Sequence, residues 1–461
     1  MVGKHRQDGV LRNLQAGVLL CIGLLMGCSA SSDAGGNVSG DLATADNVSQ
    51  DEHAPAGHFV CQQAETLLLG AEDNAEAIRL VPASTMALLL SSKARKLTLL
   101  DTAGGKLSVL RERVLFENDP TESELTNLAV SPDGMWAVCT RTFIKTDESG
   151  AQTDCAGELV FVDAGDGASF GDVTHQVEVG PMPDAVAISD DGKWVASANE
   201  RDGPDAWGKC EVAGEIPSVS IIAMGADGSA PVEAHRMAVV DAGTGPREPE
   251  SLVFSSDNDL LVVSLQDSHE VLFVRISDLQ GAGSEPTSTS VKATIVRLPD
   301  DAVGAGPWPD GVGRFQTMDG TELFVTAGEW NDTFTILNSN GGVVSNTAIS
   351  PSDIPEALPR VLSEGSPRFS PDSVATFLYE GRPHVAFTLR HSGAVAVYDL
   401  SDPAAPAFAS AVGVGKEETG QWDKEGSSVR PEGIAAAPDG EFLVTANEGE
   451  SSVSLVLPAE Q

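Results

Sequence analysis

A short segment made of Pro, an acid, any residue and an aliphatic recurs five times and constrains the fold more than any other feature. The copies begin at Pro183, Pro249, Pro309, Pro371 and Pro431, in steps of 66, 60, 62 and 60 residues. After most copies an Asp-Gly or Asp-Asn pair follows, which is typical of a hairpin turn, and two apolar strand-like runs come next. A meander of short strands cannot bury both of its faces alone, so we expect the units to stack around an axis.

Two weaker copies precede these five. One covers about residues 77–116, and the other runs from Leu128 through a Pro-Asp-Gly turn to Val162. The last copy stops soon after its third strand, so the segment Phe59 to Leu69 is predicted to supply the missing outer strand and to close the ring. The sequence therefore predicts an all-β fold, a seven-bladed β-propeller over residues 58–461. An open pair of stacked sheets is the alternative.

The balance of charges excludes one broad class of partner. The 461 residues include 28 Lys and Arg against 68 Asp and Glu, for a formal net charge of −40. Such a chain lacks the basic surface that nucleic-acid binding requires. Hydrophobic residues make up 41% of the chain, which is enough for a substantial core.

The first 27 residues resemble a bacterial lipoprotein signal peptide. Basic residues precede an apolar run from Ala16 to Met26, which is too short to span a bilayer permanently. The run ends in Leu25-Met26-Gly27-Cys28, similar to a lipobox, so Cys28 is the predicted lipidation site. Residues 28–57 are predicted to form a flexible linker. With Ser29 next, this pattern predicts a lipid-anchored protein of the cell envelope that is sent to the outer membrane and touches the membrane only through its lipid. An ordinary secretory signal is the alternative.

Four cysteines remain beyond the signal peptide: Cys61, Cys139, Cys155 and Cys210. An even number in an exported chain suggests disulfides. Cys139 and Cys155 bracket a polar excursion between two predicted strands, so a bridge between them would clamp a long hairpin and leave Cys61 to pair with Cys210. Three pairings are possible in all. No Cys-x-x-Cys occurs, which argues against a zinc or thioredoxin-type site.

Propeller topology predicts where the acids of the repeat gather. The innermost strand of a blade starts at one face of the ring and the second strand returns to that face, so acids at these two positions share one rim. The first set is Asp184, Glu250, Asp310, Asp372 and Glu432, and the second is Glu200, Asp267, Glu329 and Glu448. Crowded like charges require compensation, and carboxylate oxygens suit Ca²⁺ or Mg²⁺. The alternative is structural, with each acid accepting hydrogen bonds from a neighbouring blade.

Five arginines occur near the same repeats and are predicted to neutralise the rim or to bind an anionic substrate: Arg201, Arg314, Arg368, Arg390 and Arg430. Next to Arg390, His391 is the best-placed histidine for acid–base chemistry. These two residues are the weak catalytic candidates of the chain. No Gly-x-Ser-x-Gly elbow accompanies them.

Four stretches carry a family resemblance: residues 183–193 with Ala198-Asn199-Glu200, Pro249-Glu250 with Leu265-Gln266-Asp267, residues 393–403, and Pro431-Glu432-Gly433-Ile434 with Ala446-Asn447-Glu448. They resemble the choice-of-anchor I family of exported propellers, of the lactonase-like, YVTN type. The resemblance covers about residues 75–458 and implies the propeller fold. Two blades depart from its Asn-Glu pair, with Gly328-Glu329 and with Arg390-His391, so a ligand site implied by the family is incomplete there.

These observations favour a binding or interaction scaffold, with a small-molecule ligand or an envelope protein as its partner and a divalent cation, Ca²⁺ or Mg²⁺, as the candidate cofactor. The rival hypothesis is a metal-dependent hydrolase of phosphate esters or lactones, because some relatives are labelled alkaline phosphatase or lactonase-like. In that case rim carboxylates would hold the ion and His391 or an arginine would assist.

Overall fold

The computed structural model describes residues 59–70, 73–117, 123–146, 152–200, 217–225, 230–238, 247–279, 293–300, 304, 306–358, 369–416, 422–423 and 426–459. The predicted signal peptide, Cys28, the linker, Cys210, Arg201 and Arg368 lie outside these residues. In the described part of the chain, no helix is both long and apolar enough to cross a membrane.

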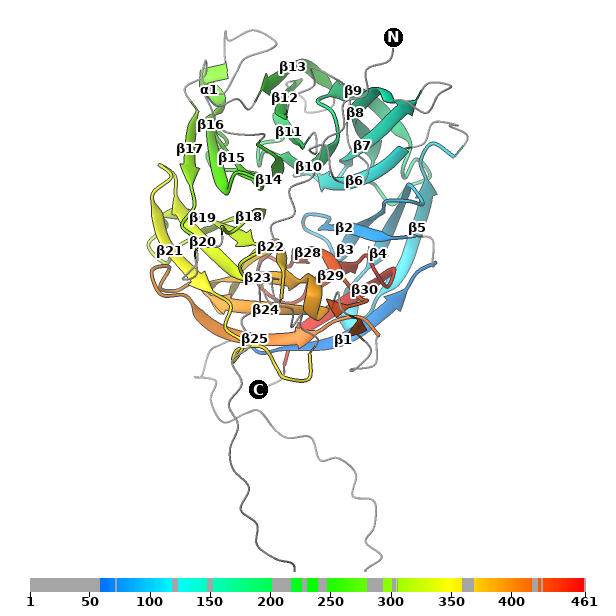
Figure 1. Ribbon diagram of the computed structural model, residues 1–461. Coiled ribbons are helices and arrows are strands. Elements are labelled where there is room, and N and C mark those ends of the chain that lie inside the picture. The colour runs from blue at the N-terminus through cyan, green and yellow to red at the C-terminus, as the bar shows by residue number, and fades with distance from the viewer. Residues whose placement is uncertain are drawn as a thin grey trace, which may run out of the picture. The chain divides into compact units, whose positions relative to one another are not determined.

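Seven four-stranded antiparallel sheets form the blades of the propeller, as predicted (Figure 1). The first three blades in chain order consist of β2 (Ala75–Leu80), β3 (Met86–Ser91), β4 (Lys96–Asp101) and β5 (Ser108–Val114); β6 (Ser123–Val130), β7 (Trp136–Thr146), β8 (Gln152–Asp163) and β9 (Val173–Val179); and β10 (Pro183–Ile188), β11 (Trp194–Asn199), β12 (Ser218–Met224) and β13 (Pro231–Ala238).

The next three blades consist of β14 (Pro249–Phe254), β15 (Leu260–Leu265), β16 (Glu270–Arg275) and β17 (Thr294–Arg297); β18 (Pro309–Gln316), β19 (Glu322–Gly328), β20 (Thr333–Asn338) and β21 (Val343–Ala348); and β22 (Pro371–Tyr379), β23 (Arg382–Leu389), β24 (Ala394–Asp399) and β25 (Ala407–Gly413). Short elements lie between strands: η1 (Ala103–Gly105), α1 (Ile276–Leu279), η2 (Arg390–Ser392), and the two-stranded β26 (Trp422–Asp423) and β27 (Gly426–Ser427).

The seventh blade joins the two ends of the described chain. It contains β28 (Pro431–Ala436), β29 (Leu443–Asn447), β30 (Ser452–Pro458) and, as its outermost strand, β1 (Cys61–Leu68). β1 pairs antiparallel with β30, with Gln62 opposite Leu457, and Figure 1 shows this blue strand beside the red one. Phe59, which is fully buried, packs edge-on against Phe377 with ring centroids 5.1 Å apart. The predicted closure by residues 59–69 is therefore confirmed.

Inner strands of successive blades contact one another all the way round the ring, from β2 through β6, β10, β14, β18 and β22 to β28 and back to β2. Buried aliphatic side chains of neighbouring sheets pack between the blades; one such cluster joins Val219 and Ile221 of one blade to Leu261 and Val263 of the next. This inter-blade packing is the core that a lone meander could not form.

The predicted Asp-Gly turns lie between the first and second strands. In one of them Ser189 Oγ donates to Asp191 Oδ1 (2.8 Å) and accepts from the Trp194 N–H (2.9 Å), while Gly192 adopts φ +69°. These side-chain bonds hold the turn and explain the recurrence of the Ser-x-Asp pattern, since Ser255 and Asp257 repeat the arrangement.

Both expected disulfide pairings are wrong. Cys61 and Cys139 are buried free thiols, and Cys155 is disulfide-bonded to neither of them. β7 and β8 form a long ladder in which Cys139 lies opposite Val160 and Cys155 opposite Ile144. The two cysteines thus lie at different levels of one hairpin. Cys61 instead donates its N–H to Ser410 Oγ, which helps to hold the closing strand.

Candidate functional site

A β-bulge at the start of every inner strand creates the site. In β10, Pro183 pairs with Asn199 and Ala185 pairs with Ala198, so Asp184 between them has no cross-strand partner. A bulge turns its extra residue out of the ladder and re-aims the side chain. Pro suits the position before the bulge because it lacks an N–H to donate. The conspicuous Pro-acid pair thus places a carboxylate at the axis of the ring.

The same bulge recurs in all seven blades, and its first residue is acidic in six of them. In ring order these residues are Glu76, Thr126, Asp184, Glu250, Asp310, Asp372 and Glu432. Glu76 was missed from the sequence because Ala replaces Pro before it in this weaker copy. The sequence did contain a signal for it, since Glu76 is followed by Ala77 and Ile78 just as Asp184 is followed by Ala185 and Val186.

A second ring follows the end of the second strand in six blades. Its members in ring order are Ser92, Glu200, Gln266, Glu329, Arg390 and Glu448; in the remaining blade the longer β7 continues past this level, and Thr142 lies within it. The backbone N–H of Gln266 donates to Glu248 O just as that of Glu200 donates to Met182 O. The prediction of Asp267 at this rim is therefore wrong by one residue: β15 ends at Leu265, Gln266 takes the rim position, and Asp267 is exposed in the following turn.

The two rings open into an axial cavity of about 710 Å³. The structure brings eight of the nine predicted acids together with Glu76 around it, and adds Gln266 and Arg390. Below the acids, the cavity wall carries aliphatic side chains, Val186, Val312, Val374 and Ile434, among polar ones such as Thr376. The channel therefore has a strongly acidic mouth above a belt of small aliphatic side chains.

Crowding perturbs the acids. Burial, and then the negative charges of neighbouring acids, raise the pKa of Glu250 and Asp310 well above the usual range. Burial raises the pKa of Asp184 to about 6. Burial, and then the charge of Asp372, also raise the pKa of Glu432 well above the usual range. Without a cation, the channel holds protons that isolated carboxylates would release near neutral pH.

Arg390 neutralises part of the negative charge of the rim acids. Its Nε lies 2.7 Å from Glu432 Oε1, its Nη2 lies 3.7 Å from Glu448 Oε2, and its Nη1 lies 3.9 Å from Glu329 Oε1. These charges raise the pKa of the guanidinium. The neighbouring His391 is not among the residues that line the cavity; its backbone N–H donates to Phe369 O. Arg390 is therefore the member of the predicted pair that reaches the channel.

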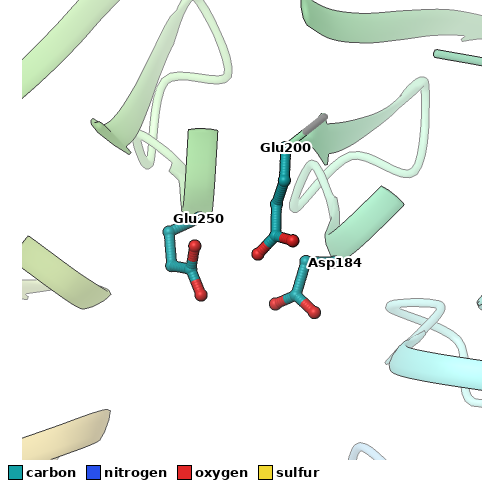
Figure 2. A group of neighbouring side chains, drawn as sticks. All are labelled: Asp184, Glu200 and Glu250. Atoms are coloured by element: carbon teal, nitrogen blue, oxygen red, sulfur yellow. The ribbon is translucent and has the colours of Figure 1, made fainter. Parts of the chain in front are cut away.

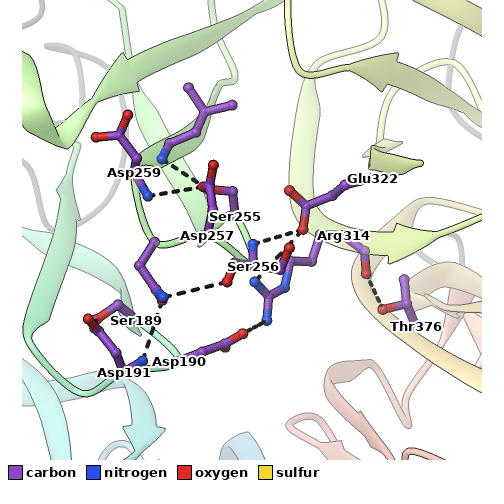
Figure 3. Close-up of polar contacts among 12 residues, drawn as sticks. Ser189, Asp190, Asp191, Ser255, Ser256, Asp257, Asp259, Arg314, Glu322 and Thr376 are labelled. Atoms are coloured by element: carbon purple, nitrogen blue, oxygen red, sulfur yellow. Dashed lines mark hydrogen bonds and ion pairs between the residues drawn. The ribbon is translucent and has the colours of Figure 1, made fainter. Parts of the chain in front are cut away.

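Arg314 lies nearer the turn face than the rim. It pairs with Asp190, in the turn after β10, and its Nη1 lies 4.0 Å from Glu322 (Figure 3). Its backbone carbonyl accepts a hydrogen bond from Thr376 Oγ1. These contacts link β18 to a turn of another blade, to β19 of its own blade and to the inner strand β22, so the guanidinium of Arg314 pairs with acids near the turn face and not with the acid ring. Of Arg430, the backbone carbonyl accepts from the Glu448 N–H.

Asp184, Glu200 and Glu250 form the tightest group of acids. One carboxylate oxygen from each lies within 4.8 Å of the others, and the three side chains converge in Figure 2. A hydrogen bond joins the Glu200 and Glu250 carboxyl groups. Asp184 comes from β10, Glu250 from β14, and Glu200 follows β11, so two adjacent blades supply the group.

The rim acids differ in whether other residues of the protein donate hydrogen bonds to their carboxylates. Glu329 accepts from Ser370 Oγ (3.2 Å) and Gln266 Nε2 (3.3 Å), which fits the structural alternative. In contrast, no donor from the described residues reaches the carboxylates of Asp184 or Asp310 within hydrogen-bond distance. These two groups face the channel with their oxygens available to a ligand.

Comparison with solved structures supports the fold. The chain is similar to U3-55K, with 11% identity over 88% of this chain and 100% of that one and a TM-score of 0.54. It is similar to the periplasmic gluconolactonase of Pseudomonas aeruginosa, with 16% identity, 83% and 90% coverage and a TM-score of 0.52. A catalytically inactive virginiamycin B lyase from Staphylococcus aureus, solved with quinupristin, has 15% identity, 87% and 99% coverage and a TM-score of 0.50.

No protein-family model and no curated protein matches the chain, so its resemblance to the choice-of-anchor I family stays a prediction. At these identities the solved structures establish architecture alone. The chain is a seven-bladed β-propeller.

Proposed function

We propose that this protein is an exported binding scaffold whose axial channel holds a divalent cation, Ca²⁺ in the first place, at Asp184, Glu200 and Glu250. The convergence of three carboxylate oxygens within 4.8 Å of one another carries the proposal. Ca²⁺ takes six to eight oxygen ligands, and carboxylates can each supply one or two of them. Water and neighbouring rim groups would complete the shell.

The electrostatics of the channel favour this occupant. Nine carboxyl groups line the mouth, and Arg390 is the cation that contacts them most closely. A dication entering the group would displace the shared proton of Glu200 and Glu250 and lower the repulsion that raises the pKa of Glu250. Metal affinity should accordingly rise with pH, since protons compete for the same oxygens.

Binding is preferred to hydrolysis because Arg390 is the member of the predicted catalytic pair that lines the cavity, and a guanidinium does not give up its proton in acid–base chemistry. Presentation at the cell envelope through a lipid on Cys28 is part of the proposal. It rests on the lipobox-like segment of the sequence.

Isothermal titration of the chelator-treated protein with Ca²⁺ and with Mg²⁺ tests the cation site. We expect Asp184→Asn to weaken Ca²⁺ binding at least tenfold, because it removes a charged ligand that no protein donor occupies. Asp267→Asn is the matched control, since it removes one acid of the same repeat that lies outside the rim. Equal losses in both variants, or no Ca²⁺ binding by the unsubstituted protein, would refute the proposal.

A further inference from the structure

Arg79 is a guanidinium that lines the acidic channel yet forms no ion pair with any described residue. Its Nη1 donates to the backbone carbonyl of Ile78 (2.9 Å) and its Nη2 donates to Asn127 Oδ1 (3.0 Å). Both acceptors are neutral. The other two cavity arginines, Arg314 and Arg390, each contact carboxylates. In a chain with 68 acids and 28 bases, an arginine left without a carboxylate is unusual.

The bulge explains how Arg79 comes to face the channel. Alternation along a strand would place residues three apart on opposite faces, but the bulge between Ala75 and Ala77 shifts the phase by one, so Glu76 and Arg79 both line the cavity. At the rise of a β-strand their backbones are about 10 Å apart along the axis. One strand thus carries a carboxylate at the mouth and a guanidinium deeper inside.

Aliphatic side chains line the wall between these two levels. Val312, Val374 and Ile434 each come two residues after a rim acid on the inner strands of three successive blades, and they line the same cavity together with polar residues such as Ser373. Around Glu76 the acids are dense: after burial, the charges of Glu432, Glu448 and Asp184 contribute to its raised pKa. From mouth to depth the channel therefore offers carboxylates, then aliphatic side chains, then the Arg79 guanidinium.

We infer that the channel binds a dipolar organic ligand whose ammonium group lies against the Glu76 side of the acid rim, whose apolar chain follows the aliphatic belt and whose carboxylate binds Arg79. A guanidinium has five N–H donors, and the protein occupies two positions of Arg79 with neutral acceptors, which leaves donors for a carboxylate. The ammonium group offsets the repulsion that a simple anion would meet at the mouth. This subsite does not depend on a cation at Asp184, Glu200 and Glu250.

Titration calorimetry with 8-aminooctanoic acid, octylamine and octanoic acid tests the inference. The amino acid carries both charges on a chain that spans about the required distance. We expect it to bind at least tenfold more tightly than either singly charged analogue. Arg79→Gln should cut its affinity by about tenfold to a hundredfold, the worth of charge-assisted hydrogen bonds, and should leave octylamine binding unchanged.

Matched variants distinguish the loss of the Arg79 contact from a general loss of folded protein. Arg111→Gln removes an exposed arginine on β5 of the same blade and should have no effect, while Arg79→Lys retains the charge and should retain part of the affinity. Ca²⁺ binding should be the same in Arg79→Gln as in the parent, so failure of this subsite is distinguishable from failure of the cation site. The inference is overturned if 8-aminooctanoic acid does not bind, binds no better than octylamine, or binds Arg79→Gln as it binds the parent.

Discussion

Replacing Arg390 by Gln should destabilise the propeller in a way that depends on pH. The guanidinium contacts Glu432 at 2.7 Å and two further acids within 3.9 Å. Breaking a fully buried pair costs about 3–5 kcal/mol and breaking an exposed one about 0–1 kcal/mol. The Arg390 side chain is 34% exposed and that of Glu432 is 14% exposed, so we expect an intermediate loss of about 2 kcal/mol at pH 7.5.

The pH dependence follows from the acids that lose their counter-charge. Burial and neighbouring charges raise the pKa of Glu432 and Asp372, so these acids take up protons sooner than ordinary carboxylates as the pH falls, and a guanidinium then has less negative charge to offset. The cost of the substitution should therefore fall below about 1 kcal/mol. Urea unfolding of both proteins at pH 7.5 and pH 5 measures this difference.

The control is Arg113→Gln, which breaks an exposed pair with Asp172 whose two side chains are 53% and 54% exposed. It should cost less than about 1 kcal/mol at either pH. If Arg390→Gln costs no more than this control, or costs the same at both pH values, then Arg390 does not compensate the acid ring.

Two further predictions concern titrating groups. The free energy of unfolding should fall from pH 5 to pH 8, and it should fall less with Ca²⁺ present. The reason is that acids such as Asp184, with a pKa raised from 3.8 to about 6, bind protons more tightly in the folded state than in the unfolded one. A flat or rising profile in urea unfolding would contradict the crowding of the rim acids. Burial raises the pKa of Cys61 to about 11 and that of Cys139 to about 12. Ellman's reagent should therefore react with these thiols only when the protein unfolds. If mass spectrometry finds them labelled in the folded protein, the blades must open.

The sequence predicted the architecture well because the repeat unit and the structural unit coincide. Pro and an acid mark the bulge at the axis in five inner strands, and Asp-Gly or Asp-Asn marks the opposite turn in four of them, so both ends of four inner strands were visible in the sequence. The missing fourth strand of the last unit pointed to residues 59–69. Local patterns of this kind depend on backbone geometry that each blade repeats.

Other features depended on contacts that no local pattern encodes. Asp267 and Gln266 are adjacent, and only the hydrogen bond from Gln266 N–H to Glu248 O decides which of them reaches the rim. The cysteine pairing failed because the register of β7 and β8 separates Cys139 from Cys155 along the ladder. Arg79 drew no notice because its position opposite Asn127 arises only when the first two blades pack side by side.

The pairing of β1 with β30 gives the molecule an unusual folding problem. Gln62 and Leu457 are partners across nearly the whole described chain, so this contact has the highest loop-closure entropy of the fold and is expected to form late. Among the described strands, the first in the chain must wait for the last. Until the two pair, β30 presents a bare edge, and a β1 from a second molecule fits it as well as its own, so refolding at high protein concentration should produce strand-exchanged dimers beside monomeric rings.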